Sequence, residues 1–189
     1  MVIELGSHGG LLKDVYFIHL IERWKKDVNV AYHHTMRLTL YTDYALRTLL
    51  YLGIHADRRV SIREIALAYG ISENHLVKVI HNLGRGGFVA THRGRGGGLT
   101  LARAPEHINV GDVVRHTEED MALVGCMAPP EPGSQTPPGG CILANACHLR
   151  GVLGEALGAF MSVLDSRTLA DLLKPYERRV LTQASPLPA

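Results

Sequence analysis

Residues 61–84 read SIREIALAYGISENHLVKVIHNLG. Ser61 is a strong N-terminal cap, and Glu64, three residues later, completes the capping-box pattern that precedes many helices. Gly70 provides a natural end for this first helix, and Ser72 begins a second one. Two short helices joined by a tight turn that contains a glycine predict a helix-turn-helix.

The second of these helices has apolar residues at helical spacing along one face, and we expect Gly84 to end it in a left-handed conformation. Such a stripe predicts that one face of the helix is buried and the opposite face is exposed. The stripe consists of Leu76, Val79, Ile80 and Leu83.

The residues around this pair predict the rest of a winged domain. Apolar spacing indicates a helix over residues 39–56, ahead of the pair. After it, residues 88–92 and 99–102 read as two short strands around the Arg/Gly-rich segment 93–98, which predicts a β-hairpin, the wing. Residues 109–116 indicate a further short helix. The expected fold is mainly α with a small β-hairpin: a winged helix-turn-helix followed by a long dimerisation helix.

The long helix is expected over residues 144–164, after a segment, 128–140, that is too rich in Pro and Gly for regular structure. Its apolar face is wide for a chain of 189 residues and could belong to the core. A symmetric dimer would also bury this face and would match a palindromic operator, so we expect a homodimer. The face consists of Leu149, Val152, Leu153, Ala156, Leu157, Phe160, Val163 and Leu164.

Charge is unevenly distributed along the chain, although the net charge is only +2. Between residues 36 and 104, Lys and Arg outnumber Asp and Glu by ten to four, whereas between residues 105 and 189 they are outnumbered by ten to six. A basic front half suits a polyanion, since the neutralised phosphates release their counterions. The simpler alternative is that charged residues are scattered over the surface without a binding role.

The polar residues of the second helix recur three or four residues apart, so they lie on the face opposite its apolar stripe. Asn can read adenine, and Lys can reach guanine or phosphate, so this face suits a major groove. A solvated helix face has the same pattern, and the neighbouring wing is what favours DNA. The candidate contacts are Ser72, Asn74, His75, Lys78, His81 and Arg85.

The expected wing carries His92, Arg93 and Arg95 among glycines. Because glycine has no Cβ, the hairpin tip can approach a sugar-phosphate backbone or place an arginine in a narrow minor groove. A tight turn alone would have the same composition. A nucleotide phosphate loop is a weak alternative, since the strand-to-helix glycine pattern is missing. The wing and the second helix together predict double-stranded promoter DNA as the partner.

The chain has only three cysteines: Cys126, Cys141 and Cys147. An odd number is a poor disulfide framework, whereas thiolates suit iron or zinc. Such sites usually take four protein ligands, so one is missing. His148 is awkward as the fourth, because adjacent helical residues point about 100° apart. Asp43 is an oxygen donor with Arg47 one turn later to hold it, although the two could form a simple intrahelical ion pair.

Three parts of the sequence resemble the NsrR repressors, relatives of IscR and RirA. These parts are MRLTLYTDYALR at residues 36–47, RGRGGGL at 93–99 and the cysteine trio, and the similarity extends from Met36 to about Leu173. The resemblance implies a homodimeric winged helix-turn-helix repressor that holds an iron-sulfur cluster, either 4Fe-4S or 2Fe-2S. In NsrR, nitric oxide destroys the cluster and releases promoters of nitric-oxide detoxification genes.

The same resemblance makes the three cysteines the thiolate ligands, Asp43 of the same or the partner subunit the oxygen ligand, and Arg47 its support. Two departures matter. The family places its first two cysteines a few residues apart, whereas 14 residues separate Cys126 from Cys141 here. IscR uses a histidine three residues beyond its last cysteine, where this chain has Arg150, which favours the carboxylate.

These features divide the chain into five expected segments. Residues 1–35 carry no recognisable motif and are either an upstream, non-native translation extension or a loosely attached helix. Residues 36–117 are the expected DNA-binding domain, and residues 118–147 are a cysteine-bearing cluster loop. Residues 148–175 are assigned to the dimerisation helix and the following turn, and residues 176–189 to a C-terminal tail.

Other functions fit parts of the pattern. A thiol redox enzyme would need a Cys-x-x-Cys pair or a cysteine activated by a histidine, and the closest pair here is six residues apart, so we expect no enzyme. A zinc-stabilised DNA-binding protein without a sensing role would use the same thiols. Within the regulator class, iron or cluster status is an alternative signal to nitric oxide. No apolar run is as long as a membrane span, which needs about 18 residues, and no secretory signal is evident. We therefore expect a cytoplasmic protein without a membrane partner.

Overall fold

The computed structural model describes residues 37–130, 141–143 and 146–183. The chain divides into two units, residues 1–37 and 38–189, and the description below concerns the second. The expected extension, residues 1–35, lies outside the described residues, and so do residues 131–140 of the Pro/Gly-rich segment. Among the described residues, no helix is long and apolar enough to cross a membrane.

The described part of the chain is mainly helical and contains one two-stranded antiparallel hairpin, which confirms the expected fold class. Its elements are α2 (Leu40–Ile54), α3 (Ile62–Tyr69), α4 (Glu73–Arg85), β1 (Val89–His92), β2 (Gly98–Leu101), the 3-10 turn η1 (Pro105–His107), α5 (Val110–Thr117), the 3-10 turn η2 (Gly125–Met127), α6 (His148–Asp165), α7 (Leu169–Leu172) and α8 (Pro175–Gln183).

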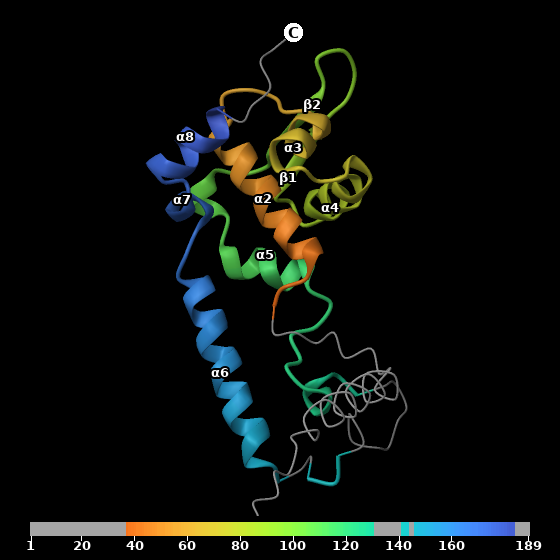
Figure 1. Cartoon of the computed structure of the whole chain (residues 1–189), viewed down its shortest axis with the longest axis vertical. Coiled ribbons are helices and arrows are strands. Elements are labelled where there is room, and N and C mark those ends of the chain that lie inside the picture. Colours follow the sequence, from red (N-terminus) through yellow and green to blue (C-terminus); the bar gives the residue numbers. More distant parts are fainter. Residues whose placement is uncertain (1–36, 131–140, 144–145, 184–189) are drawn as a thin grey trace, which may run out of the picture. The chain divides into compact units, whose positions relative to one another are not determined.

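Helix α2 lies at the centre of this unit (Figure 1). It packs against α3, α4, α5, α7, α8 and strand β2. The hydroxyl of Thr39 accepts a hydrogen bond from Thr42 N at 3.2 Å, which caps the helix one residue inside the predicted start. The residues of α2 that face the core are fully or almost fully buried: Ala45, Leu49, Tyr51 and Leu52.

Helices α3 and α4 form the predicted helix-turn-helix. Ser61 Oγ accepts from Glu64 N at 3.1 Å, and Gly70 ends α3 with a left-handed φ of 64°. The Glu64 carboxylate, expected to complete the capping box, accepts instead from Tyr51 Oη at 3.0 Å and from the Arg58 guanidinium. The predicted stripe of α4 is buried in full: Leu76, Val79, Ile80 and Leu83.

The predicted stop at Gly84 is wrong. Gly84 is helical, α4 continues to Arg85, and the glycine with a positive φ is Gly87, at 68°. Phe88 N donates to Leu83 O at 2.9 Å and Gly87 N to Gly84 O at 3.1 Å, the pair of bonds that closes a Schellman end. This pair of bonds requires a left-handed residue at Gly87, three positions after Gly84. Helix α4 therefore extends past the predicted end.

The wing is the hairpin of β1 and β2, with Val89 opposite Leu101 and His92 opposite Gly98. Val60, ahead of α3, forms a bridge with Leu99, so β2 is attached to the segment before α3 close to the hairpin turn. A Cβ on Gly97 would lie 2.5 Å from the carbonyl oxygen of His92, so the turn requires glycine there. The predicted strands, their order and the Arg/Gly-rich connection are confirmed.

Helix α5 connects the winged part to the long helix α6. The hydroxyl of Thr42 in α2 donates to that of Thr117 at 2.8 Å, and both are buried. At the other side, Arg115 of α5 forms an ion pair with Asp165 of α6 at 2.5 Å. Asn109, the cap of α5, also donates to the carbonyl oxygen of Asp165 at 2.6 Å.

Helix α6 begins at His148, four residues after the predicted start, because Cys147 has an extended conformation and caps it. Residues 144 and 145 lie outside the described part. No residue of α6 is buried within the single chain. Its apolar face is therefore outside the core, with Leu149, Val152, Phe160 and Val163 exposed by 64%, 60%, 44% and 61%.

The residues after α6 return to the core. Residues 176–189 were expected to be a tail, but residues up to Gln183 form α8, and Leu181 belongs to the core. Pro175, at the first position of α8, was a usable signal, since proline is favoured there. The single buried leucine on an otherwise polar helix gave too weak a periodicity to be predicted.

Candidate nucleic-acid interface and thiol site

The outward face of α4 is exposed and mainly polar, with Val77 as its one exposed large apolar residue. Burial of the opposite stripe turns this face away from the core. All six candidate contacts on α4 and its cap are exposed: Ser72, Asn74, His75, Lys78, His81 and Arg85. These residues therefore present hydrogen-bond donors and acceptors, and Lys78 and Arg85 add positive charge.

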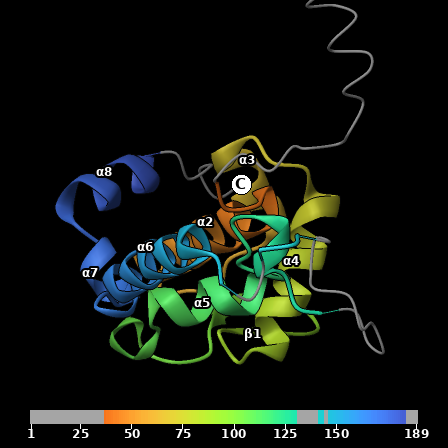
Figure 2. The same cartoon turned by 90° about the horizontal axis from the view of Figure 1, so that it is seen from below.

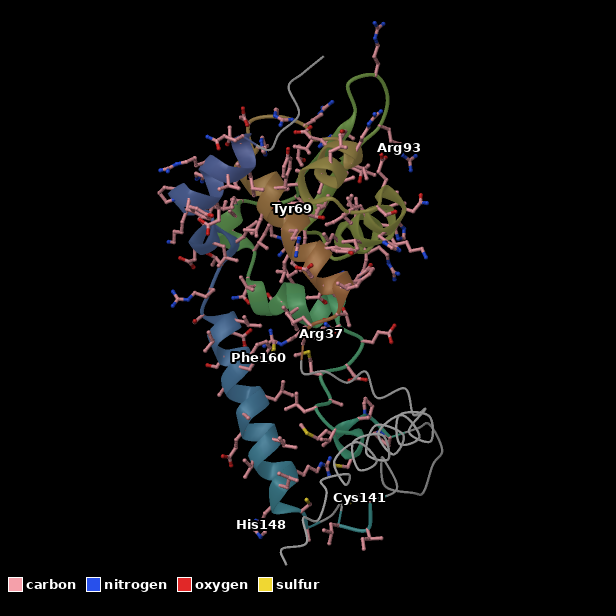
Figure 3. All side chains as sticks on the ribbon, viewed as in Figure 1. Arg37, Tyr69, Arg93, Cys141, His148 and Phe160 are labelled. Carbon is pink, nitrogen blue, oxygen red and sulfur yellow. The ribbon has the colours of Figure 1, made fainter. Side chains whose placement is uncertain are left out.

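The wing lies beside α4 in both views (Figures 1 and 2), and β1 is in contact with that helix. Arg93 and Arg95 are exposed at the hairpin turn, and Figure 3 shows Arg93 on the side of the fold where α4 lies. His92 is partly buried, and its Nε2 is 2.9 Å from Thr100 Oγ1 on the opposite strand. Two basic elements thus share one side of the unit.

Two contacts from α2 hold the exposed helix in place. Tyr41 Oη donates to the carbonyl oxygen of Lys78 at 3.1 Å. The ring of Tyr44 stacks on that of His75, with centroids 6.3 Å apart. The first turns of α2 are therefore attached to α4 at two of the residues that were predicted to read DNA.

One residue of this surface, Arg59, was not among the predicted contacts. Its guanidinium donates to the carbonyl oxygen of Gly96 at 2.9 Å and so holds the wing tip that carries Arg93 and Arg95. Only the contact between residues 37 positions apart reveals this role. The Arg58-Arg59 pair was a visible basic signal in the sequence, but nothing local connected it to the hairpin.

The three thiols are free and partly exposed. Cys126 lies in η2, Cys141 follows the segment outside the described residues, and Cys147 caps α6. Within the described residues, no three His, Cys, Asp or Glu side chains gather as a metal site.

Asp43 and Arg47 pair along α2, as expected. Arg47 Nε donates to Asp43 Oδ1 at 2.8 Å, with 43% and 38% of the two side chains exposed. The Arg47 guanidinium also lies 5.7 Å from the centroid of the Tyr69 ring. Burial raises the pKa of Tyr69 to about 12, so its ring stays neutral beside the cation. Arg47 is thus held by two partners and fixes one carboxylate oxygen.

A helix-turn-helix with an adjacent wing and one exposed basic side defines the class of DNA-binding regulators. Residues 38–175 match the model of the Rrf2 family, described as iron-dependent transcriptional regulators, and the chain belongs to this family.

Within that family the chain is similar to NsrR-type regulators. It is 48% identical to the HTH-type transcriptional regulator NsrR of Bacillus licheniformis over 139 residues, 73% of this chain and 92% of the relative. The identity to NsrR of Geobacillus kaustophilus is 49% over 140 residues, which cover 74% of this chain and 90% of the relative. The suggested resemblance to NsrR repressors is thereby confirmed.

Solved structures give the same fold. IscR of T. potens superposes with a TM-score of 0.59 at 28% identity, covering 76% of this chain and 90% of that chain. CymR (YrzC), the global cysteine regulator of B. subtilis, has a TM-score of 0.58 at 26% identity, with 74% and 97% covered. The protein is a transcriptional regulator with a winged fold, and these relatives favour this class over a thiol redox enzyme.

Proposed function

We propose that this regulator is an iron-sulfur repressor that binds promoter DNA as a homodimer and is released when nitric oxide reacts with its cluster. The observation that carries the proposal is a set of three free, partly exposed thiols on a winged chain that is 48% identical to an NsrR regulator. The acidic second half, with its thiols, would sense, and the basic first half would bind DNA.

The DNA contacts are assigned to α4 and the wing. Asn74 and Lys78 can read base edges in the major groove, because their side chains extend from the exposed face of a helix whose other face is packed. Arg93 and Arg95 can reach phosphates or a narrow minor groove from the turn. His92 is partly buried and bonded to Thr100, so we assign it to stiffening the hairpin and not to a main DNA contact.

The partner that covers α6 is assigned to a second copy of the chain. Side chains as large as Leu149, Val152 and Val163 are each at least 60% exposed on one helix. Contiguous apolar surface of this kind usually marks an interface. A two-fold axis along α6 would place two α4 helices on a palindromic operator.

The donor set suits an iron-sulfur cluster in kind. Three thiols supply soft ligands, and Asp43 supplies an oxygen ligand whose Oδ1 is already engaged by Arg47. Within the described residues, no second hydrogen bond to this carboxylate occurs, so Oδ2 is available. The gathering of the thiols belongs to the proposal, since thiolate ligands commonly come together only as metal binds.

The three cysteines and Asp43 would hold the cluster, whose iron would supply the reactivity with nitric oxide, and the oxygen ligand would be the most labile of the four. The chain's own part is to transmit the loss of that ligand. Asp43 lies two residues after Tyr41, whose hydroxyl bonds to the Lys78 carbonyl of α4 at 3.1 Å. Loss of Asp43 as a ligand would therefore act on the first turn of α2, which supports α4 through this bond.

The variant Cys147→Ala tests the ligand assignment. Anaerobically purified variant is expected to lose the visible absorbance of the cluster and the nitric-oxide-sensitive binding of promoter DNA in a gel shift. His148→Ala is the matched control, because this neighbouring side chain is exposed and is not assigned as a ligand. Persistence of both properties in Cys147→Ala would refute the assignment.

The same preparation separates the alternatives from the proposal. A colourless protein with one bound zinc ion and undiminished DNA binding would identify a zinc-stabilised regulator without sensing. A coloured protein whose DNA binding responds to iron removal but not to nitric oxide would identify a sensor of iron or cluster status. Loss of DNA binding after stoichiometric nitric oxide supports the function proposed here.

A further inference from the structure

The turn between α4 and β1 is held by a residue of α5 that is neither a DNA contact nor a thiol. His116 Nε2 lies 2.8 Å from the carbonyl oxygen of Asn82 in α4. Because a carbonyl oxygen only accepts, Nε2 must carry the hydrogen. In return, Asn82 Nδ2 donates to the carbonyl oxygen of His116 at 3.5 Å. Two reciprocal bonds thus join the last turn of α4 to the last turn of α5.

A second residue holds the same turn from the wing. Arg103 follows β2 by two residues, and its Nε donates to the carbonyl oxygen of Gly87 at 3.0 Å. A terminal nitrogen of the same guanidinium donates to the carbonyl oxygen of Gly86, also at 3.0 Å. Its central carbon lies 4.9 Å from the centroid of the Phe88 ring. The residue that follows β2 thus binds the turn that precedes β1.

The space around this turn is filled. Phe88 is only 5% exposed, and its ring centroid lies 5.4 Å from that of His116. A Cβ on Gly86 would come within 2.7 Å of both His116 Nε2 and Phe88 Cε2. The orientation of α4 relative to the wing is therefore set by the contacts of His116 and Arg103 and not by a flexible connection.

We infer that His116 and Arg103 are positioning residues for DNA recognition, which fix the angle between α4 and the wing. His116 also makes this angle depend on α5. That helix is bonded to α2 through the Thr117 and Thr42 hydroxyls, at 2.8 Å, and to α6 through Arg115 and Asp165. The inference rests on the proposed use of α4 and the wing to contact DNA.

A change in this angle affects specific and nonspecific binding differently. Base contacts need α4 and the wing to reach their grooves together, whereas nonspecific binding depends on charge near the phosphates. His116→Leu removes no lysine or arginine, and Arg103→Lys replaces one positive charge with another. Both are therefore expected to lower the preference for the operator and to leave nonspecific affinity unchanged.

The experiment uses the full chain, purified anaerobically, and an operator selected from random-sequence DNA by the unmodified protein. Dissociation constants are measured for this operator and for a scrambled duplex of the same length. His116→Leu and Arg103→Lys are each expected to weaken operator binding by about three- to tenfold, the range for one lost hydrogen bond. His116→Gln retains an N–H donor and is expected to recover most of the loss.

Two readouts separate positioning from a merely structural role. The thermal unfolding midpoint identifies variants that only destabilise the fold, and these would lose specific and nonspecific binding in parallel. Parallel loss in both His116→Leu and Arg103→Lys, or an unchanged operator preference in both, would overturn the inference. Nitrogen-15 spectra assigned by comparison with His116→Gln are expected to show the Nε2–H tautomer of His116, and the Nδ1–H tautomer would contradict it.

Parallel measurements on Lys78→Ala and Arg95→Ala test the function on which the inference rests. If both bind the operator like the unmodified protein, α4 and the wing do not contact DNA, and the proposed function fails. If they bind more weakly while His116→Leu and Arg103→Lys keep the operator preference, only the positioning role fails.

Discussion

At the scale of single residues, Asp171 shows how one carboxylate returns the chain to the core after α6. Its Oδ2 accepts from Thr168 N at 2.9 Å and from Thr168 Oγ1 at 3.0 Å, which completes a capping box at the start of α7. These bonds, the backbone bond above all, lower the pKa of Asp171. The box fixes the first residue of α7, Leu169, which is 2% exposed in the core.

The variant Asp171→Asn is expected to lower the free energy of unfolding at neutral pH. A carboxylate with a lowered folded pKa stabilises the fold above its unfolded pKa of about 3.9, and this stabilisation is lost as the pH falls through the folded value. The difference between parent and variant should therefore shrink towards zero in acid. Urea unfolding followed by circular dichroism over that pH range measures it, and a difference that does not vary with pH would contradict this role.

At the scale of elements, the end of α4 distinguishes two glycines that look equivalent in the sequence. Gly84 is inside the helix, and a Cβ there would meet only the carbonyl oxygen of Val89, at an ordinary 3.7 Å. Gly87 has a φ of +68°, which other residues adopt at a cost. The end of α4 therefore depends on the second glycine and not on the first.

Gly84→Ala and Gly87→Ala should consequently change stability in opposite directions. Alanine is favoured over glycine within a helix by about 0.5–1 kcal/mol, whereas the left-handed conformation costs alanine about 1–2 kcal/mol. Chemical denaturation of the two variants provides the comparison, each serving as the control of the other. If Gly84→Ala destabilised the protein and Gly87→Ala had no effect, Gly84 and not Gly87 would be the residue that ends α4.

The elements that local patterns define were predictable, and those that distant contacts define were not. The stripe of α4 and the strands of the wing follow from periodicity and turn residues within a few positions. Helix α8 was missed because Leu181 is its one buried residue. The folded chain was needed to find the partners of the Glu64 carboxylate, which are Tyr51 Oη and the Arg58 guanidinium. It was also needed to find the contact of Arg59 with the wing tip.

The candidate site divides in the same way. Exposure of the α4 face and of Arg93 and Arg95 could be anticipated, because burial of one helix face exposes the other. The contacts of His116 and Arg103 with the α4 turn could not, since each joins residues far apart in the sequence. The common site of Cys126, Cys141 and Cys147 stays a prediction, based on their number, chemistry and family resemblance.

At the scale of the whole molecule, α5 lies between the elements that carry three proposed surfaces. The exposed side of α4 and the wing would bind DNA, the apolar face of α6 would bind a second copy, and the thiols with Asp43 would bind the cluster. Helix α5 contacts both α2 and α6 and is bonded to α4 through His116. In the proposed dimer, a change at the thiols would reach the α4 helices of the two subunits through α6 and α5 and would alter their spacing.

The most direct test of this account follows iron and DNA binding in one anaerobic preparation. Iron and sulfide content, the visible absorbance spectrum and an operator gel shift are recorded before and after stoichiometric nitric oxide. We expect a coloured, iron-containing dimer that binds the operator. On addition of nitric oxide, it should lose its visible absorbance and release the DNA. An iron-free protein that binds the same operator with full affinity, before and after nitric oxide, would contradict it.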